Sequence, residues 1–94
     1  DVIAVRDGKS YLIDCKVCSR GRFPFSRIED NQHTAMRAWQ ESGNGTGWFA
    51  LKCEGYIFML DYDTLKRLSK TQSSISFKDM CFYGRVLEAW VVFA

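Results

Sequence analysis

The stretch DVIAVRDGKSYLIDCK, Asp1–Lys16, decides the fold of this 94-residue chain. Val2 to Arg6 is rich in β-branched residues, which favour an extended strand. Asp7-Gly8 is typical of a two-residue hairpin turn, and Ser10 to Lys16 is predicted to return as a second, antiparallel strand. The chain therefore begins with a β-hairpin, from which the other predictions follow.

Side chains alternate between the two faces of a strand. Leu12, Asp14 and Lys16 are therefore expected on one face of the second strand, with Cys15 on the other. The hairpin turn brings Asp1 back beside Asp14, in approximate register. Two neighbouring carboxylates repel each other unless a cation or a proton lies between them. A hard divalent cation such as Mg²⁺, which takes carboxylate, water and phosphate oxygens, resolves this repulsion.

These residues together predict a site for metal-assisted phosphate chemistry. Asp1 and Asp14 would bind Mg²⁺, with the backbone carbonyl of Cys15 as a third ligand and Mn²⁺ as a substitute metal. The Lys16 ammonium would contact a phosphate or orient a water for in-line attack on a phosphodiester. Strand-end acids that only form surface ion pairs are the alternative. A D-x-K triplet alone is a weak signal, but a second Asp thirteen residues earlier, across a turn, strengthens it.

Val17 to Arg27 is predicted to be a loop that contacts DNA. It contains no acidic residue and carries Arg20, Arg22 and Arg27, interleaved with two phenylalanines. Such a segment can lie along a phosphate backbone, and Lys9 in the hairpin is a further candidate contact. The alternative is an ordinary solvated loop whose phenylalanines enter the core.

The rest of the chain alternates between helical and extended patterns. The predicted elements are a helix over Ile28–Ser42 capped by Asp30 or Asn31, strands over Gly47–Cys53 and Tyr56–Asp61, a helix over Leu65–Ser69 capped by Asp61 or Asp63, a short helix opened by the capping-box residues Ser76 and Asp79, and a tail over Val86–Phe93 that is helical in its first half. This order predicts a single α/β domain over residues 1–94, with a central mixed sheet of about four strands flanked by helices.

Composition narrows the function classes. The chain is 47% hydrophobic, enough for a packed core, and its net charge of +2 does not by itself require a nucleic-acid partner. The sequence contains no glycine-rich phosphate loop, so binding of ATP or NAD is not expected. No run is long and apolar enough for a membrane span, and no secretory leader opens the chain, so a cytoplasmic location is expected.

The chain has four cysteines, with one C-x-x-C pair at Cys15 and Cys18. A structural zinc site usually needs two such pairs. Reduced and mostly buried thiols are therefore the preferred interpretation, and a zinc-stapled interaction domain is the weaker one.

The motif Asp1…Asp14-Cys15-Lys16 resembles the core of the PD-(D/E)XK nuclease superfamily, with Asp in the variable acidic position. Within it, the chain is most similar to the Holliday junction resolvases of archaea and Gram-positive bacteria and to their phage relatives. The similarity covers about residues 1–70: the whole opening hairpin, the Phe-Pro-Phe loop, a helix opening with Gln32, and the strands GWFALK and YIFML.

The resemblance implies a restriction-endonuclease-like core and a metal-dependent endonuclease acting on branched DNA, in recombination or phage DNA processing. It implies that Asp1 and Asp14 bind the metal, that Lys16 is the catalytic lysine, and that Gln32 extends from its helix towards them. It also implies a homodimer, because a four-way junction presents two symmetric cuts. The family's acidic N-terminal helix has no counterpart before Asp1, so that helix is expected to be missing from this chain.

Other interpretations remain open at this point. The chain could be a different nuclease of the same superfamily, acting on DNA ends, mismatches or restriction sites. It could instead be a DNA-binding module that keeps the fold without turnover. His33, the single histidine, is expected at the surface rather than as a general base. The tail aromatics Phe82, Tyr83, Trp90 and Phe93 are expected in the core rather than at an interface.

Overall fold

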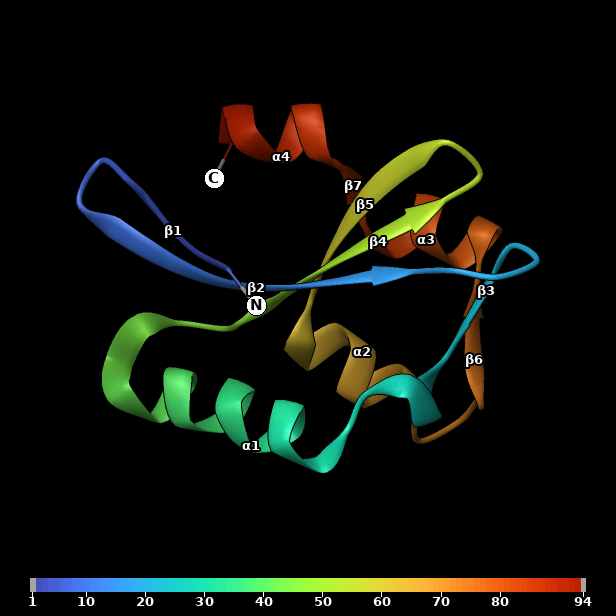
Figure 1. Ribbon diagram of the computed structural model, residues 1–94, viewed down its shortest axis with the longest axis horizontal. Coiled ribbons are helices and arrows are strands. Elements are labelled where there is room, and N and C mark those ends of the chain that lie inside the picture. Colours follow the sequence, from blue (N-terminus) through green and yellow to red (C-terminus); the bar gives the residue numbers. More distant parts are fainter. Residues whose placement is uncertain (1, 94) are drawn as a thin grey trace.

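The computed structural model describes residues 2–93 and has an α/β fold built on a mixed five-stranded sheet (Figure 1). The strands lie in the order β1-β2-β4-β5-β7, and β3 and β6 form a separate two-stranded sheet. The elements are β1 (Val2–Arg6), β2 (Lys9–Val17), β3 (Arg22–Pro24), η1 (Phe25–Arg27), α1 (Asp30–Trp39), η2 (Gln40–Asn44), β4 (Trp48–Cys53), β5 (Tyr56–Asp61), α2 (Tyr62–Leu68), β6 (Ser74–Ser76), α3 (Phe77–Tyr83), β7 (Arg85–Val86) and α4 (Leu87–Phe93).

Two predicted hairpins are confirmed. β1 pairs antiparallel with β2 around Asp7 and Gly8, and β4 pairs antiparallel with β5 around Glu54 and Gly55. All four turn residues have positive φ, between 51° and 82°. Such φ values match the right-handed twist of the flanking strands, and glycine adopts them without the strain that a Cβ causes.

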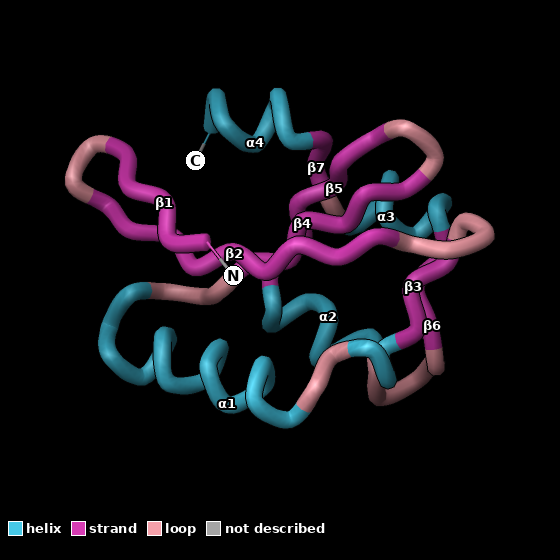
Figure 2. The backbone as a smooth tube through the Cα atoms, in the orientation of Figure 1, coloured by secondary structure: helices cyan, strands magenta, loops and turns pink. Residues whose placement is uncertain are grey.

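The sheet is mixed because β2 and β4 run parallel, whereas its other neighbouring strands are antiparallel. The chain between β2 and β4 crosses one face of the sheet and contains α1. Figure 1 shows α1 and α2 below the sheet and α4 above it. Figure 2 shows the β1–β2 hairpin projecting beyond the rest of the molecule.

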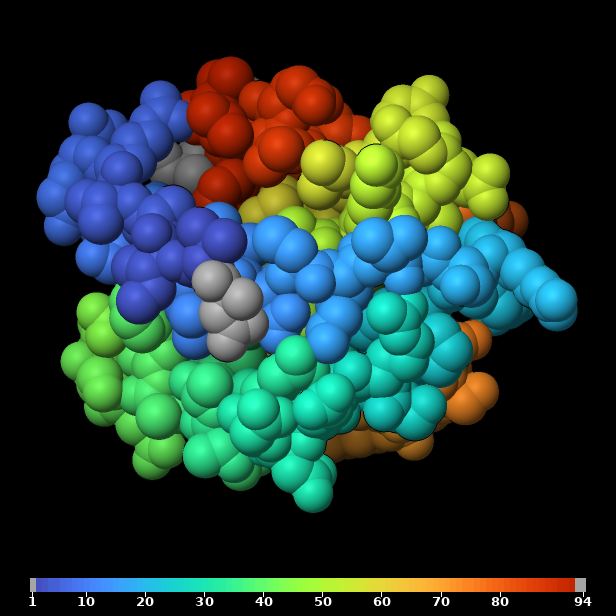
Figure 3. All heavy atoms as spheres, viewed as in Figure 1, coloured from blue at the N-terminus to red at the C-terminus, as the bar shows by residue number. Residues whose placement is uncertain are grey.

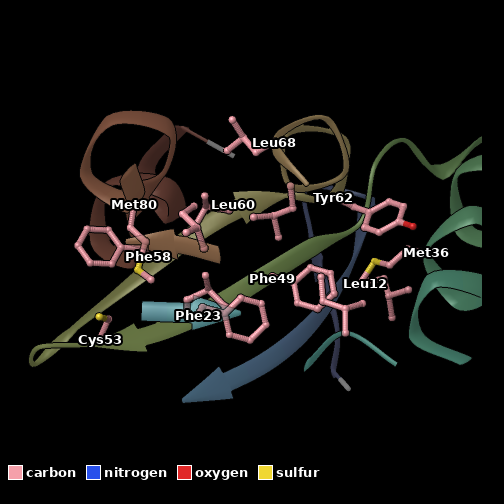
Figure 4. Packing of buried hydrophobic residues seen from close by; sticks show 14 residues of the cluster. Leu12, Phe23, Met36, Phe49, Cys53, Phe58, Leu60, Tyr62, Leu68 and Met80 are labelled. Carbon is pink, nitrogen blue, oxygen red and sulfur yellow. The ribbon is translucent and has the colours of Figure 1, made fainter. Parts of the chain in front are cut away.

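Two apolar clusters cover the two faces of the sheet. The larger lies on the face of α1 and α2 and includes Leu12, Met36, Phe49 and Tyr62, which Figure 4 shows packed together. The smaller cluster lies on the face of α4 and is centred on Tyr11, Met59 and Trp90. Strand alternation explains the division: Leu12 and Tyr11 are neighbours in β2 and point to opposite faces.

The predicted loop over residues 17–27 is wrong in part. Arg20 and Gly21 form a tight turn, after which β3 pairs with β6 and η1 follows. Phe23 is completely buried opposite Ile75. The segment is therefore not a flexible arm, because an apolar anchor and a strand partner about fifty residues away hold it in place.

Helix starts follow the expected capping chemistry with one exception. Asp61 caps α2 by accepting from the backbone N–H of Thr64, and Ser76 and Asp79 form the predicted capping box of α3. The N-cap of α1 is Glu29, whereas the sequence predicted Asp30 or Asn31. The reason is a reciprocal bond from the first turn, in which the backbone N–H of Glu29 donates to Gln32 Oε1 at 2.9 Å.

The tail is helical, as predicted for its first half, but the aromatic residues near the C-terminus differ in burial. Trp90 is buried, whereas Phe82 is 79% exposed and Tyr83 is 39% exposed, so the prediction of a core role is wrong for these two. The side chain of Phe93 lies outside the described residues. Strands β6 and β7 were not predicted, because two- and three-residue strands carry too little pattern to be recognised.

The cysteines are less buried than expected. Cys53 is buried and Cys18 partly so, but Cys15 and Cys81 are exposed, and all four are reduced. Within residues 2–93, no helix is long and apolar enough to cross a membrane.

Candidate active site

Asp14 and Lys16 lie on the same face of β2, as predicted. The parallel register places Asp14 opposite Phe49 and Lys16 opposite Leu51, and both β4 residues are completely buried. The two polar side chains therefore project from the sheet on its α1 side. Figure 3 shows β2, in light blue, crossing the visible face with the start of α1, in green-cyan, against it.

Asp14 is the one polar residue among the buried side chains of the described chain, at 4% exposed. Its Oδ2 atom is buried and has no hydrogen-bond partner within residues 2–93. Leaving a buried polar group unsatisfied costs roughly 1–3 kcal/mol, and more for a charged group. The large majority of buried side-chain polar atoms in native proteins have a partner, so an exception at a carboxylate needs a cause.

The surroundings of Asp14 oppose its ionisation. Burial raises the pKa of the Asp14 carboxyl above its ordinary value, and the negative charge of Glu29 raises it further. The Lys16 ammonium acts in the opposite direction but does not outweigh the desolvation. A cation beside Asp14 would supply the missing compensation, because an adjacent positive charge favours the carboxylate form.

Glu29 is a candidate that the sequence did not single out. It is exposed, lies at the N-cap of α1, and acts electrostatically on Asp14. The signal in the sequence was its place directly before the helix that carries Gln32. Gln32 lies three positions after Glu29, and its side-chain oxygen accepts a hydrogen bond from the backbone N–H of Glu29. Gln32 is partly buried in the first turn, and its oxygen has a structural role there.

The other two predicted metal ligands are Asp1 and Cys15. Asp1 lies outside the described residues; the register of β1 with β2 reaches Val2, which lies opposite Ile13. The side chain of Cys15 is exposed on the sheet face opposite Asp14, as expected. Among the described residues, the segment from Asp14 to Val17 pairs with β4 on one side and with no strand on the other side.

The predicted DNA-binding residues do not form one cluster. Arg20 is exposed at the tip of its turn. Arg22 donates to Ser74 Oγ at 2.9 Å, and Arg27 donates to the backbone carbonyl of Val17, with its guanidinium 5.4 Å from the ring of Phe23.

Lys9 lies apart from the three arginines. It belongs to the odd-numbered face of β2, and its ammonium is 5.3 Å from the ring centroid of Tyr11. Lys9 and Asp14 therefore lie on opposite faces of the sheet.

His33 is not a simple surface residue. It is partly buried, and its Nδ1 lies 2.6 Å from the hydroxyl of Tyr62. Burial lowers the pKa of His33, with a further contribution from the Arg37 guanidinium. His33 therefore joins α1 to α2 and does not belong to the Asp14 site.

No group of three or more His, Cys, Asp or Glu side chains within the described chain could hold a metal by itself. The chemistry of Asp14 nevertheless fits one ligand of a divalent cation, because its buried carboxylate oxygen has no hydrogen-bond partner among residues 2–93.

No model of a known protein family matches this chain, and no curated protein sequence matches it either.

Proposed function

We propose that this chain is a metal-dependent endonuclease that hydrolyses phosphodiester bonds in DNA, with four-way junctions as the preferred substrate. The observation that carries the proposal is Asp14: an almost fully buried carboxylate, one oxygen of which has no hydrogen-bond partner in the described part of the chain, two residues before a lysine on the same strand face. An unsatisfied buried acid is costly to stability, and such costs concentrate at functional sites.

Asp14 would be one ligand of Mg²⁺ or Mn²⁺, with Asp1 and the backbone carbonyl of Cys15 as the other protein ligands. Val2, the residue after Asp1, lies opposite Ile13, the residue before Asp14, which supports this pairing of acids. When bound, the metal supplies Lewis-acid stabilisation of phosphate charge and lowers the pKa of a coordinated water. The proposed restriction-endonuclease-like core rests on the same motif, together with the mixed sheet.

Lys16 would bind the scissile phosphate. Its ammonium is a mobile point charge on a partly buried stem, and it lies on the Asp14 face opposite Leu51. In that position it can stabilise the negative charge that develops on a phosphate oxygen as the bond breaks. Gln32 would orient the first turn of α1 against this face, since its side-chain oxygen holds Glu29 in place.

A branched substrate and a pair of subunits belong to the same proposal. A four-way junction has two symmetric cut sites, which a C2 dimer matches. β1 supports self-association: it is an edge strand, and its apolar Val2, Ile3 and Val5 are 50%, 63% and 67% exposed. Exposed apolar edges of this kind are candidates for pairing with another chain.

The test is cleavage of labelled four-way junction and of linear duplex with the same arms, with and without Mg²⁺. We expect cutting of the junction only with metal. Asp14→Asn and Lys16→Ala should each reduce the rate at least about a hundredfold while binding persists, because the first removes a metal ligand and the second removes the ammonium that would stabilise charge on the reacting phosphate.

The controls are Asp7→Asn and Lys70→Ala, which remove one acid and one lysine from exposed positions away from β2's buried face. Asp7 has positive φ, which Asn tolerates. Equal cutting by Asp14→Asn and wild type would overturn the assignment. Binding without metal-dependent cutting by wild type would instead favour a DNA-binding module, and equal rates on duplex and junction would remove the junction preference.

A further inference from the structure

A cavity of about 310 Å³ lies on the sheet face opposite Asp14. Its walls come from β2, β4, β7, α4, the end of η2 and the chain after it; the lining residues are Lys9, Tyr11, Asn44, Gly45, Thr46, Trp48, Arg85 and Trp90. Its volume lies at the lower end of the roughly 300–1,000 Å³ range of small-molecule sites.

The aromatic wall of the cavity is held rigidly. Trp90 contacts Tyr11 and Trp48 edge-to-face, with ring centroids 5.2 Å and 5.3 Å apart. Tyr11 and Trp90 are nearly buried, whereas Trp48 is partly exposed. A planar ligand could therefore pack against a preformed indole wall without ordering new side chains, which favours binding.

The Lys9 ammonium sets the sign of the ligand charge that the cavity favours. Lys9 and Arg85 both line it, and no acidic side chain lines it within the described chain. The Lys9 ammonium lies 5.3 Å from the Tyr11 ring, at the edge of the aromatic wall. A cationic ligand of the kind that aromatic cages bind would be repelled by Lys9, so an aromatic ligand with a negative group fits best.

A second hollow adjoins the cavity. It is lined by Gly8, Lys9, Ser10 and the 43–45 segment, and it shares Lys9, Asn44 and Gly45 with the first. Three of its lining residues are glycines, and a Cβ at any of them would meet nothing within 4 Å. A ligand extending out of the aromatic cavity would therefore find open polar space with a lysine at the junction.

We infer that this cavity binds a nucleoside monophosphate unit, with its base against Trp48 and Trp90 and its phosphate at Lys9. Base–aromatic stacking combined with a basic groove is the usual mode of binding for single-stranded nucleic acid. The unit could be a free nucleotide or part of a single strand continuing into the adjoining hollow. The inference does not depend on the proposed cleavage, because the sheet separates the cavity from Asp14.

The experiment uses the three indole N–H signals of ¹⁵N-labelled protein, assigned by single Trp→Phe variants. Titration with dTMP should shift the signals of Trp48 and Trp90 and leave that of Trp39 in place. Trp39 packs in the larger cluster on the other face of the sheet, so it serves as an internal control. Shifts of all three indoles, or of none at millimolar dTMP, would overturn the inference.

Three comparisons test the chemistry. Lys9→Gln should weaken dTMP binding about tenfold, because it removes a charged partner of the phosphate. Trp48→Leu should weaken it by a similar factor, because it removes a stacking surface, while Lys70→Gln, an exposed lysine elsewhere, should not change it. Thymidine binding as tightly as dTMP, or unchanged binding by Lys9→Gln, would contradict the assignment.

A fourth arm compares dTMP with a (dT)₆ oligonucleotide. Tighter binding of the oligonucleotide at the same indoles would identify a strand as the source, whereas equal binding per nucleotide would identify the free nucleotide. Asp14→Asn should bind both probes like wild type even where DNA cutting is lost. Failure of this inference and failure of the proposed nuclease can therefore be told apart.

Discussion

Asp14 is the residue at which stability and chemistry conflict most clearly. Leu12 precedes it on the same sheet face, and Phe49 lies directly opposite it, so both of these neighbours are apolar. A leucine at this position would continue the apolar face of β2 that Leu12 begins, and no unpartnered carboxylate oxygen would remain. A buried acid in that position is costly without a partner, and a divalent cation would provide one.

The first prediction concerns Asp14 and pH. The pKa of Asp14 in the folded chain is raised above its ordinary value of 3.8, so the native state binds a proton where the unfolded state has released it. The free energy of unfolding should therefore fall as pH rises from about that ordinary value through the folded pKa. Asp14→Asn should remove this fall and raise stability at pH 7 by on the order of 1 kcal/mol, since a buried charge is removed. Urea unfolding at several pH values measures it, and a lower stability of the variant at pH 7 would contradict it.

The second prediction concerns metal at the same residue. Mg²⁺ at about a hundred times its dissociation constant should raise wild-type stability by about 2.7 kcal/mol, because a ligand of the native state stabilises it by mass action. Asp14→Asn should lose most of this gain, whereas Asp7→Asn should keep it. Thermal unfolding with and without Mg²⁺ provides the readout. Equal stabilisation of both variants would place the metal elsewhere.

At the level of the elements, the turn over residues 19–22 and strand β3 position the basic residues Arg20 and Arg22. The backbone N–H of Arg22 donates to the carbonyl of Ser19 at 3.0 Å, which closes the turn around Arg20. Phe23 then fixes β3 in the core. Arg22 and Arg27 donate hydrogen bonds to Ser74 and Val17 within the chain. Arg20, exposed at the tip of the turn, is therefore the best-placed phosphate contact.

The third prediction follows from this arrangement. Arg20→Ala should reduce the slope of log binding constant against log salt by about 0.9, the value for one lost phosphate contact on duplex DNA. Adding Arg22→Ala should reduce it further only if Arg22 leaves Ser74 on binding. Arg67→Ala, an exposed arginine in the last turn of α2, is the matched control. An unchanged slope for Arg20→Ala would mean that the turn does not touch DNA.

The fourth prediction concerns the capping box of α3. The backbone N–H of Asp79 donates to Ser76 Oγ, and the backbone N–H of Ser76 donates to the Asp79 carboxylate, both at 3.1 Å. Ser76→Ala should lower the free energy of unfolding by about 1 kcal/mol, as for other N-cap losses. Ser73→Ala, at an exposed position nearby, should change it little. Equal values for the two variants, measured by denaturant unfolding, would show that the box contributes nothing.

On the scale of the whole molecule, the sheet separates two different surfaces. One face carries Asp14 and Lys16 beside α1, and the other carries the aromatic cavity beside α4. The projecting β1–β2 hairpin contributes residues to both surfaces, because the side chains of β2 alternate between the faces (Figure 2). Its exposed edge is therefore the candidate surface for a second copy.

The fifth prediction tests that edge. Wild type should sediment as a dimer, and Ile3→Lys should shift it towards monomer, because a charge on an edge strand opposes pairing with another strand. The free energy of unfolding of the Ile3→Lys monomer should differ little from that of wild type, since Ile3 is 63% exposed. Val92→Lys, at a 66% exposed position on α4, is the control. Dimers of unchanged strength in Ile3→Lys would exclude this edge.

Features that depend on near neighbours could be predicted from the sequence. Turn chemistry specifies the hairpins, capping residues specify the starts of α2 and α3, and period-two alternation places Leu12, Asp14 and Lys16 on one face. Features that depend on distant partners are visible only in the folded chain. Segments about fifty residues apart meet where β3 pairs with β6. There Arg22 donates to Ser74, and Phe23 is buried opposite Ile75. Distant segments also produce the burial of Asp14, the action of the Glu29 charge on it, and the contact between Trp48 of β4 and Trp90 of α4. Local patterns specify which way a side chain points, but burial and electrostatics depend on what the rest of the chain brings to that place.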